Sequence, residues 1–282
     1  MKLTLPDKST RDLKNGSTGF DLANDIGPGL AKAAVAVTVD GVQRDLHDPI
    51  MHDANISIIT IDSEEGLEIM RHTLAAQVLA RAVKNLYPKS KLAIGPTIKD
   101  GFYYDVECKE TISIDDLKKI EKEMDKIVKT KSSITKKLLS KKDALKVFKD
   151  KDESYKEEII NDSDQKDQFQ LYYQDDEDFV DLCKGPHLPN LNFIGAYKLT
   201  TISGAYWKGD SSNTMLTRIY GTAWSNEKDL NEHLNNIEEA QKRDHRKLGK
   251  EMDLFHFQDE APGMVFWHPN GWSIYRLSLI HI

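Results

Sequence analysis

The segment 179–187, FVDLCKGPH, constrains the fold most, because it forces a tight bend between two chemically active side chains. Its Gly-Pro pair cannot continue a helix or a central strand. Cys183 and His187 must therefore flank the bend, with the carboxylate of Asp181 close by. Such a bend aims a thiol and an imidazole into one pocket. On spacing alone, a buried cysteine beside a capping histidine explains the segment equally well.

A second part of the pattern lies far upstream, in the segment 67–86, LEIMRHTLAAQVLARAVKNL. Apolar residues recur there at helical spacing among good helix formers, so the sequence predicts a helix. His72 and Ala76 lie one turn apart and share a face of that helix. Histidine at both positions would present two imidazoles to one metal or one substrate. Here only His72 is present.

The composition is that of a soluble globular protein with two or three domains, because 282 residues is long for one core and 39% are hydrophobic. The formal net charge of −7 argues against a general coat on nucleic acid but allows a local basic face. The start of the chain lacks the apolar region of a secretory signal, and no apolar run has membrane-spanning length. Two cysteines, Cys108 and Cys183, suit a reducing compartment, so a cytoplasmic protein without a membrane partner is expected.

Residues 1–62 predict a small β-grasp fold like that of ubiquitin. A short helix is expected over 20–33, interrupted by a Gly-Pro-Gly sequence. Short strands are expected at 2–5, 11–13, 35–41, 42–46 and 56–61.

Residues 63–225 mix helices with strands in an order that fits an α+β sandwich. The segment 114–129 predicts an amphipathic helix, with Asp in its first turn and Lys near its end. The polar segment 152–170 is expected to be partly loop. The remaining expectations are strands at 101–105 and 131–140, a helix at 141–150 and a strand-turn-strand at 170–183.

Residues 226–252 predict one long helix with a basic second half. Such a run of charge is usually a solvated helix face. Its basic residues include Lys242, Arg243, Arg246 and Lys247.

Many separate blocks of the chain, taken in order, resemble bacterial threonyl-tRNA synthetases. The blocks are MRHTLAAQVLARAVKNLYP, LAIGPTIKDGFYYDV, ESYK, DLCKGPH, GAYWKGD, RIYGTAW, KRDHRKLGKEMDLF and APGMVFWHPNGW, and the resemblance runs from Met1 to about Tyr275. So many blocks at matching spacing make the resemblance specific. It implies a β-grasp TGS domain at 1–62, a tRNA-editing domain shared with alanyl-tRNA synthetases at 63–225, a linker helix at 226–253 and a truncated start of a class II catalytic domain at 254–282.

The resemblance implies that the full-length enzyme is a homodimer that charges tRNA(Thr) with threonine in an ATP-dependent reaction. ATP, Mg and Zn serve that reaction in the family, at sites outside the residues present here. The final LSLIHI departs from the family pattern, so a truncated end is expected. For this portion the implied reaction is hydrolysis of mischarged seryl-tRNA(Thr). A pocket gains only about 1–3 kcal/mol from one methylene-sized group, which is too little to reject serine without a second site.

The resemblance assigns this editing reaction to five positions. His72 or His187 would orient or deprotonate a water molecule. Lys156 would stabilise the oxyanion or bind the terminal ribose, and Asp181 would receive the charged amino group of the substrate. Cys183 would line the pocket or coordinate a metal. The alternative roles are a surface lysine and a loop-capping aspartate.

Two further groups of residues have roles by resemblance. Tyr103 and Tyr104 would bound the pocket and exclude the threonine methyl, although both are also ordinary strand residues. The basic helix would lie near the acceptor arm of the tRNA, through Lys242, Arg243, Arg246 and Lys247.

A metal site is one interpretation of the same residues. His72, Cys183 and His187 give three ligands with an open fourth position, as in catalytic zinc sites. The fourth residue of the family is replaced by Ala76, which has no donor atom, and threonyl editing sites generally use water where the related alanyl domains bind zinc. Two hypotheses therefore stay open: a synthetase portion that proofreads, and a non-catalytic tRNA-binding or regulatory module with a degenerate editing site.

Overall fold

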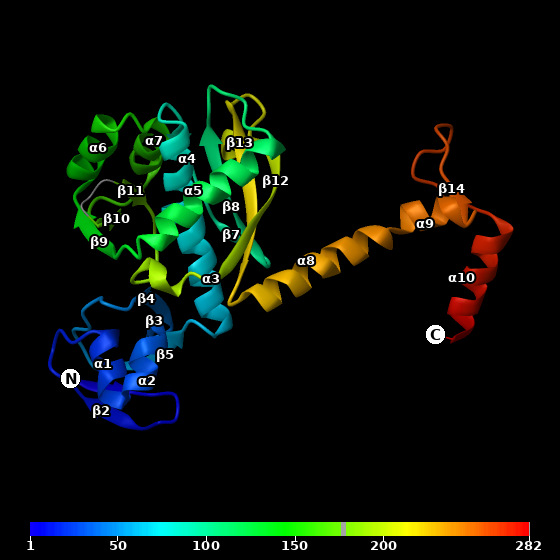
Figure 1. The fold of residues 1–282 in the computed structure, drawn as a ribbon. Helices are drawn as coiled ribbons and strands as arrows, with labels where there is room; N and C mark the ends of the chain where they lie inside the picture. The colour runs from blue at the N-terminus through cyan, green and yellow to red at the C-terminus, as the bar shows by residue number, and fades with distance from the viewer. Residues whose placement is uncertain (176–178, 282) are drawn as a thin grey trace. The chain divides into compact units, whose positions relative to one another are not determined.

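The computed structural model describes residues 1–175 and 179–281, and the chain divides into two compact units, Met1–Leu230 and Asn231–Ile282 (Figure 1). Helices and mixed sheets are both present, so the α+β class is confirmed. Within the described part of the chain, no helix combines the length and the apolar character needed to cross a membrane.

The N-terminal part is a five-stranded mixed sheet with two helices. Its elements are β1 (Lys2–Thr4), β2 (Thr10–Asp12), α1 (Gly19–Ile26), α2 (Pro28–Ala33), β3 (Ala34–Val39), β4 (Val42–Asp45) and β5 (Ala54–Thr60). The strand order is β2-β1-β5-β3-β4, with β1 and β5 parallel. The helix predicted over 20–33 is split, because Pro28 lacks an N–H and starts a new helix. Leu22 of α1 packs with Leu3 and Val37 in the core of this sheet.

A continuous helical segment carries residues 64–86 and contains a π-helical turn. It consists of α3 (Glu64–Thr73), the π turn η1 (Leu74–Leu79) and α4 (Ala80–Leu86). It begins at Ser63, whose hydroxyl accepts a hydrogen bond from the N–H of Gly66. The helix predicted over 67–86 is therefore confirmed, and the π turn, a feature often found at functional sites, comes directly after His72.

A larger antiparallel sheet packs against one side of this helix. Its strands are β6 (Lys91–Leu92), β7 (Thr97–Ile98), β8 (Gly101–Glu107), β12 (Ala196–Tyr206) and β13 (Met215–Trp224), with short 3-10 turns at η3 (Leu191–Phe193) and η4 (Trp207–Gly209). The strand order is β12-β13-β8-β6, and β7 pairs with β8. The helix predicted over 114–129 is present as η2 (Ile114–Asp116) and α5 (Leu117–Lys129), and buries Ile120 and Met124.

A smaller sheet, in the order β11-β10-β9, contributes to the other side of the same core. Its region holds β9 (Ile134–Leu139), α6 (Lys141–Asp150), α7 (Ser154–Asp162), β10 (Phe169–Gln174) and β11 (Phe179–Leu182). The helix α7 falls in the segment predicted to be partly loop. The buried Glu153 at its start pairs with Lys84 and accepts the N–H of Leu92, so tertiary contacts decide that structure. The turn predicted between β10 and β11 falls on residues 176–178, outside the described residues.

The prediction of a single helix over 226–252 is wrong. The chain forms two helices, because the Asp244 carboxylate accepts the N–H of Arg246 and caps a new one. The elements here are α8 (Glu227–Lys242), α9 (His245–Glu251), β14 (Phe255–His256), β15 (Phe266–Trp267) and α10 (Pro269–His281).

Candidate functional site

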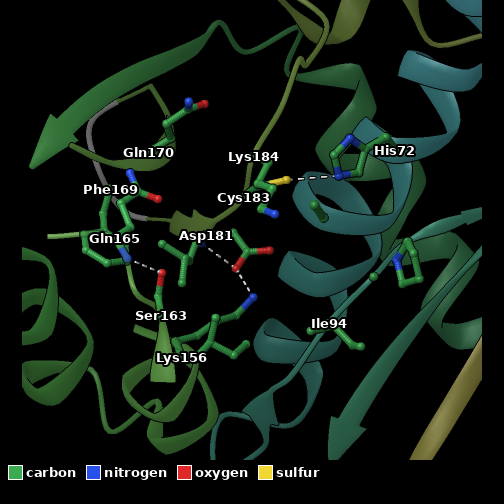
Figure 2. A pocket seen from close by; sticks show the side chains of 15 residues that line it. His72, Ile94, Lys156, Ser163, Gln165, Phe169, Gln170, Asp181, Cys183 and Lys184 are labelled. Carbon is green, nitrogen blue, oxygen red and sulfur yellow. Dashed lines mark hydrogen bonds and ion pairs between the residues drawn. The ribbon is translucent and has the colours of Figure 1, made fainter. Parts of the chain in front are cut away.

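A cavity of about 420 Å³ lies beside the π turn of the long helix (Figure 2). His72 and Ala76 reach it from that helix, and Lys156 reaches it from α7. Asp181 on β11 and Cys183 just after it also line the cavity, and its other polar lining residues are Ser163, Gln165, Gln170 and Lys184. Sequence positions that are far apart in the chain therefore meet at one cavity.

The thiol of Cys183 and the imidazole of His72 are in contact with each other at the wall of this cavity (Figure 2). The Cys183 Sγ atom lies 2.9 Å from His72 Nε2. Burial lowers the pKa of His72 below its ordinary value, although the charge of Asp181 opposes that effect. The imidazole is therefore neutral at neutral pH. The Pro186 carbonyl accepts a hydrogen bond from the ring, so the nitrogen that faces Cys183 Sγ is the one that can accept a proton.

His187 lies behind this pair and is 2% exposed. Its ring centroid is 4.6 Å from that of His72 and 4.4 Å from that of Tyr172. The predicted meeting of the cysteine with both histidines occurs, since ligand atoms of His72, Cys183 and His187 all lie within 4.8 Å of one another. His187 does not border the 420 Å³ cavity directly.

The tautomer of His187 follows from its contact with Thr73. The Thr73 hydroxyl donates to the carbonyl of Ile69 at 2.8 Å, so its single proton is used. The Thr73 Oγ1 atom must then accept from His187 Nδ1, which lies 3.2 Å away. Neutral His187 therefore carries its proton on Nδ1. Its Nε2 atom is buried, and no described residue forms a hydrogen bond with it.

A buried ion pair forms the opposite wall of the cavity. Lys156 Nζ lies 2.5 Å from Asp181 Oδ1, and the two side chains are 3% and 2% exposed. The Tyr104 hydroxyl donates to Asp181 Oδ2 at 2.9 Å, and the N–H of Leu182 donates to Oδ1 at 2.8 Å. Burial, followed by the Asp181 charge, raises the pKa of Tyr104 well above its ordinary value, so the phenol stays a donor.

The two tyrosines predicted to bound the pocket lie on opposite faces of β8. Tyr104 is fully buried; its hydroxyl donates to Asp181, and its ring centroid lies 5.6 Å from Lys156 Nζ. Tyr103 faces the other way, because side chains alternate along a strand. The guanidinium of Arg218 lies 3.9 Å from its ring centroid. Neither Tyr103 nor Tyr104 is among the residues that line the cavity, which corrects the expected placement of both.

The basic residues predicted to bind tRNA lie on α8 and α9. Most of them pair with acidic neighbours in their own segment: Lys242 with Glu238 at 2.9 Å, and Arg246 with Asp244 at 2.7 Å. Arg243 pairs with Glu239 at 3.2 Å, and Lys247 lies 3.9 Å from Glu251. Their positive charge is thus partly offset on the surface.

Several residues of the site gave no signal in the sequence. Ile94, Gly95 and Pro96 line the cavity opposite the polar wall. Thr73 stands next to His72 in the chain, but only the fold shows that its hydroxyl reaches a second histidine. The contacts of Tyr172 and Asp45 with the His187 turn join segments that no sequence spacing connects.

Two protein families match parts of this chain. Residues 1–60 match the TGS domain, and residues 170–220 match the threonyl and alanyl tRNA synthetase second additional domain. Threonine–tRNA ligases from Prochlorococcus marinus (strain MIT 9211) and Hahella chejuensis (strain KCTC 2396) are each 50% identical to it over 98% of this chain. This chain corresponds to the N-terminal portion of threonyl-tRNA synthetases. The ligase of Psychrobacter cryohalolentis is 47% identical over the same share of the chain.

The threonyl-tRNA synthetase homologues are much longer than this chain, which spans 43% of the first relative and 42% of the Psychrobacter one. The match to the second additional domain covers β10, β11, the Cys183–His187 bend and most of the β12–β13 hairpin. It therefore includes Asp181, Cys183 and His187, while His72 and Lys156 lie outside it and reach the same cavity through the fold.

Proposed function

We propose that the 420 Å³ cavity hydrolyses the ester bond of mischarged seryl-tRNA(Thr). The observation that carries the proposal is the meeting of a neutral imidazole, a thiol and a buried ion pair at one cavity, in a chain homologous to threonine–tRNA ligases. A water molecule placed between a proton acceptor and a cation is what ester hydrolysis requires.

Each wall of the cavity has a role in that reaction. His72 accepts a proton from water as the water oxygen bonds to the carbonyl carbon of the ester. Lys156 donates to the oxyanion that forms, and the bond to the ribose oxygen then breaks as that oxygen takes up the proton. Asp181 receives the ammonium group of serine. The products are serine and uncharged tRNA.

Zinc fits the donor atoms of the same site. His72, Cys183 and His187 would hold it, and the buried Nε2 atom of His187 is a ligand atom that lacks a hydrogen-bond partner among the described residues. A bound zinc ion would polarise a water molecule at its open position. The protein groups described above would orient the substrate in either case.

The test is release of serine from seryl-tRNA(Thr) by this chain, with threonyl-tRNA(Thr) as the competing substrate. We expect selective release of serine, and loss of that release in His72→Gln. The matched control is His52→Gln, because His52 is an exposed histidine of the N-terminal part with a 56% exposed side chain. Equal hydrolysis of both esters, or full activity in His72→Gln, contradicts the proposal.

A second candidate is a tRNA-binding module without hydrolysis. It is favoured by Ala76, which lines the cavity and offers no donor atom one turn from His72. In that case the chain binds tRNA(Thr) but releases no serine, and Ala76→His restores release. Serine release by the unmodified chain excludes this candidate.

We infer that this chain comprises three domains and a linker, and that the protein it corresponds to charges tRNA(Thr) with threonine. The strand order β2-β1-β5-β3-β4 supports a β-grasp TGS domain over 1–62, followed by the editing domain over 63–225, a linker over 226–253 and the start of a class II catalytic domain over 254–282. Its relatives' names support threonine charging of tRNA(Thr) with ATP. Threonine-dependent ATP–pyrophosphate exchange by a protein spanning the relatives' full length tests this.

A further inference from the structure

We propose that Asp45, at the end of β4 in the N-terminal sheet, is a positioning residue for the cavity. It holds the bend that carries Cys183 and His187, so the N-terminal sheet takes part in the reaction without touching the substrate. This inference rests on the hydrolytic function proposed above. The match to the TGS domain covers Asp45, whereas the bend belongs to the second additional domain.

Both carboxylate oxygens of Asp45 are used by the neighbouring domain. Oδ1 accepts the backbone N–H of His187 at 2.9 Å, and Oδ2 accepts the hydroxyl of Tyr172 at 2.7 Å. Lys136 lies 2.7 Å from the same Oδ2 and 2.5 Å from Asp48, which balances the buried charge. The Asp45 side chain is only 15% exposed, so these bonds form away from bulk water. Charge-assisted hydrogen bonds of this kind are stronger than neutral ones.

Tyr172 links Asp45 to the imidazole of His187, because its hydroxyl bonds to Asp45 and its ring contacts the His187 ring. Its ring meets the ring of His187 edge-on, at 78° and 4.4 Å between centroids. Its hydroxyl would lie only 1.9 Å from a Cβ atom at Gly185, so the backbone of the bend packs directly on Tyr172. Gly185 has φ of +67°, a conformation that favours glycine. Asp45 thus holds the bend at one end through a backbone N–H and along its side through Tyr172.

The consequence for chemistry is the orientation of His187. The bend fixes the ring so that Nδ1 meets Thr73 Oγ1, while Nε2 points to a position where no described residue forms a hydrogen bond with it. Partners behind a ligand or catalytic imidazole fix its tautomer in this way, and their loss typically costs about 10–100-fold in activity or metal affinity. The contact could instead serve only to join two domains. The two roles differ in what happens to the imidazole when Asp45 is replaced.

The experiment compares Asp45→Ala with Asp48→Ala in the full chain. Asp48 shares the ion pair with Lys136, but no hydrogen bond between Asp48 and His187 or Tyr172 occurs among the described residues, so it is the matched control. We expect Asp45→Ala to lower kcat/KM for seryl-tRNA(Thr) about 10–100-fold and Asp48→Ala to change it by roughly twofold at most. Asp45→Asn, which keeps an oxygen for the His187 N–H, is expected to recover part of the loss.

The second readout is the tautomer of His187, measured by ¹H–¹⁵N NMR of the histidine rings without substrate. We expect a single Nδ1–H form in the wild type and in Asp48→Ala, and a mixed population in Asp45→Ala. Tyr172→Phe, which removes the hydroxyl and keeps the ring, gives the same comparison if Asp45→Ala does not fold. An unchanged His187 spectrum in the Asp45 and Tyr172 variants, or equal losses in the Asp45 and Asp48 variants, overturns the proposal. Absence of hydrolysis in the wild type refutes the proposed function, while the NMR comparison still decides the positioning role.

Discussion

Replacing Lys156 with methionine leaves the carboxylate of Asp181 buried without its cation, and we expect a large loss of stability. Both side chains are at most 3% exposed and 2.5 Å apart. Removing one partner of a buried ion pair typically costs about 3–5 kcal/mol. The Tyr104 hydroxyl and the Leu182 N–H remain as donors to Asp181, which keeps the expected cost within that range rather than above it.

The assay is urea unfolding at pH 7, followed by circular dichroism. Lys156→Met with Asp181→Asn removes both charges and keeps an oxygen that accepts from Tyr104, so it should recover most of the loss. The control is Lys184→Met, since Lys184 is an exposed lysine at the same cavity, and its effect should stay within about 0.5 kcal/mol. A loss under about 1 kcal/mol in Lys156→Met, or no recovery in the double variant, refutes the argument.

Three further outcomes are expected. Burial lowers the folded-state pKa of His72, so the unfolded chain binds more protons than the folded one as the pH falls below about 6.5. The free energy of unfolding should therefore drop there. In urea unfolding with a chelator present, His72→Gln should make the dependence of that free energy on pH less steep. Gly221→Ala puts a Cβ 2.5 Å from the buried Phe102 ring and should cost about 1–3 kcal/mol by thermal unfolding, whereas Gly29→Ala, with nothing within 4 Å, should not destabilise. Replacing Lys242 and Arg246 together with alanine should weaken tRNA binding and flatten its salt dependence; an unchanged salt slope would assign those residues to the scaffold.

Hydrophobic periodicity was enough to predict the elements whose own residues decide their structure. The helix over 67–86 was expected because apolar residues recur there with the helical period, and the strands β3 and β5 because they are rich in apolar, β-branched residues. The helix α7 was not, because a buried Glu153 bonded to Lys84 and Leu92 fixes its start. The break between α8 and α9 was missed because the capping role of Asp244 depends on a local backbone conformation that the sequence pattern does not show.

The candidate site was predictable only where the residues carried chemistry of their own. Cys183 and His187 stood out by type and spacing, and His72 by its place on an amphipathic helix. Asp45 and Tyr172 did not, because their effect depends on a contact between domains that lie far apart in the chain. Tyr103 and Tyr104 looked equivalent in sequence, and only the direction of β8 separates the one that reaches Asp181 from the one that does not.

Because Ala76 has only a methyl side chain, the proposed hydrolysis depends more strongly on how the imidazoles of His72 and His187 are oriented. A histidine there would supply a second proton acceptor on the cavity wall beside His72, and the chain has none at that point. A water molecule in the cavity must then be held by His72 and Cys183, and the His187 ring packs behind His72. The placement of that ring depends on the Thr73 contact and on the bend that Asp45 holds. If this chain releases serine without a second histidine, its activity should therefore be more sensitive to Asp45→Ala than that of its own Ala76→His variant.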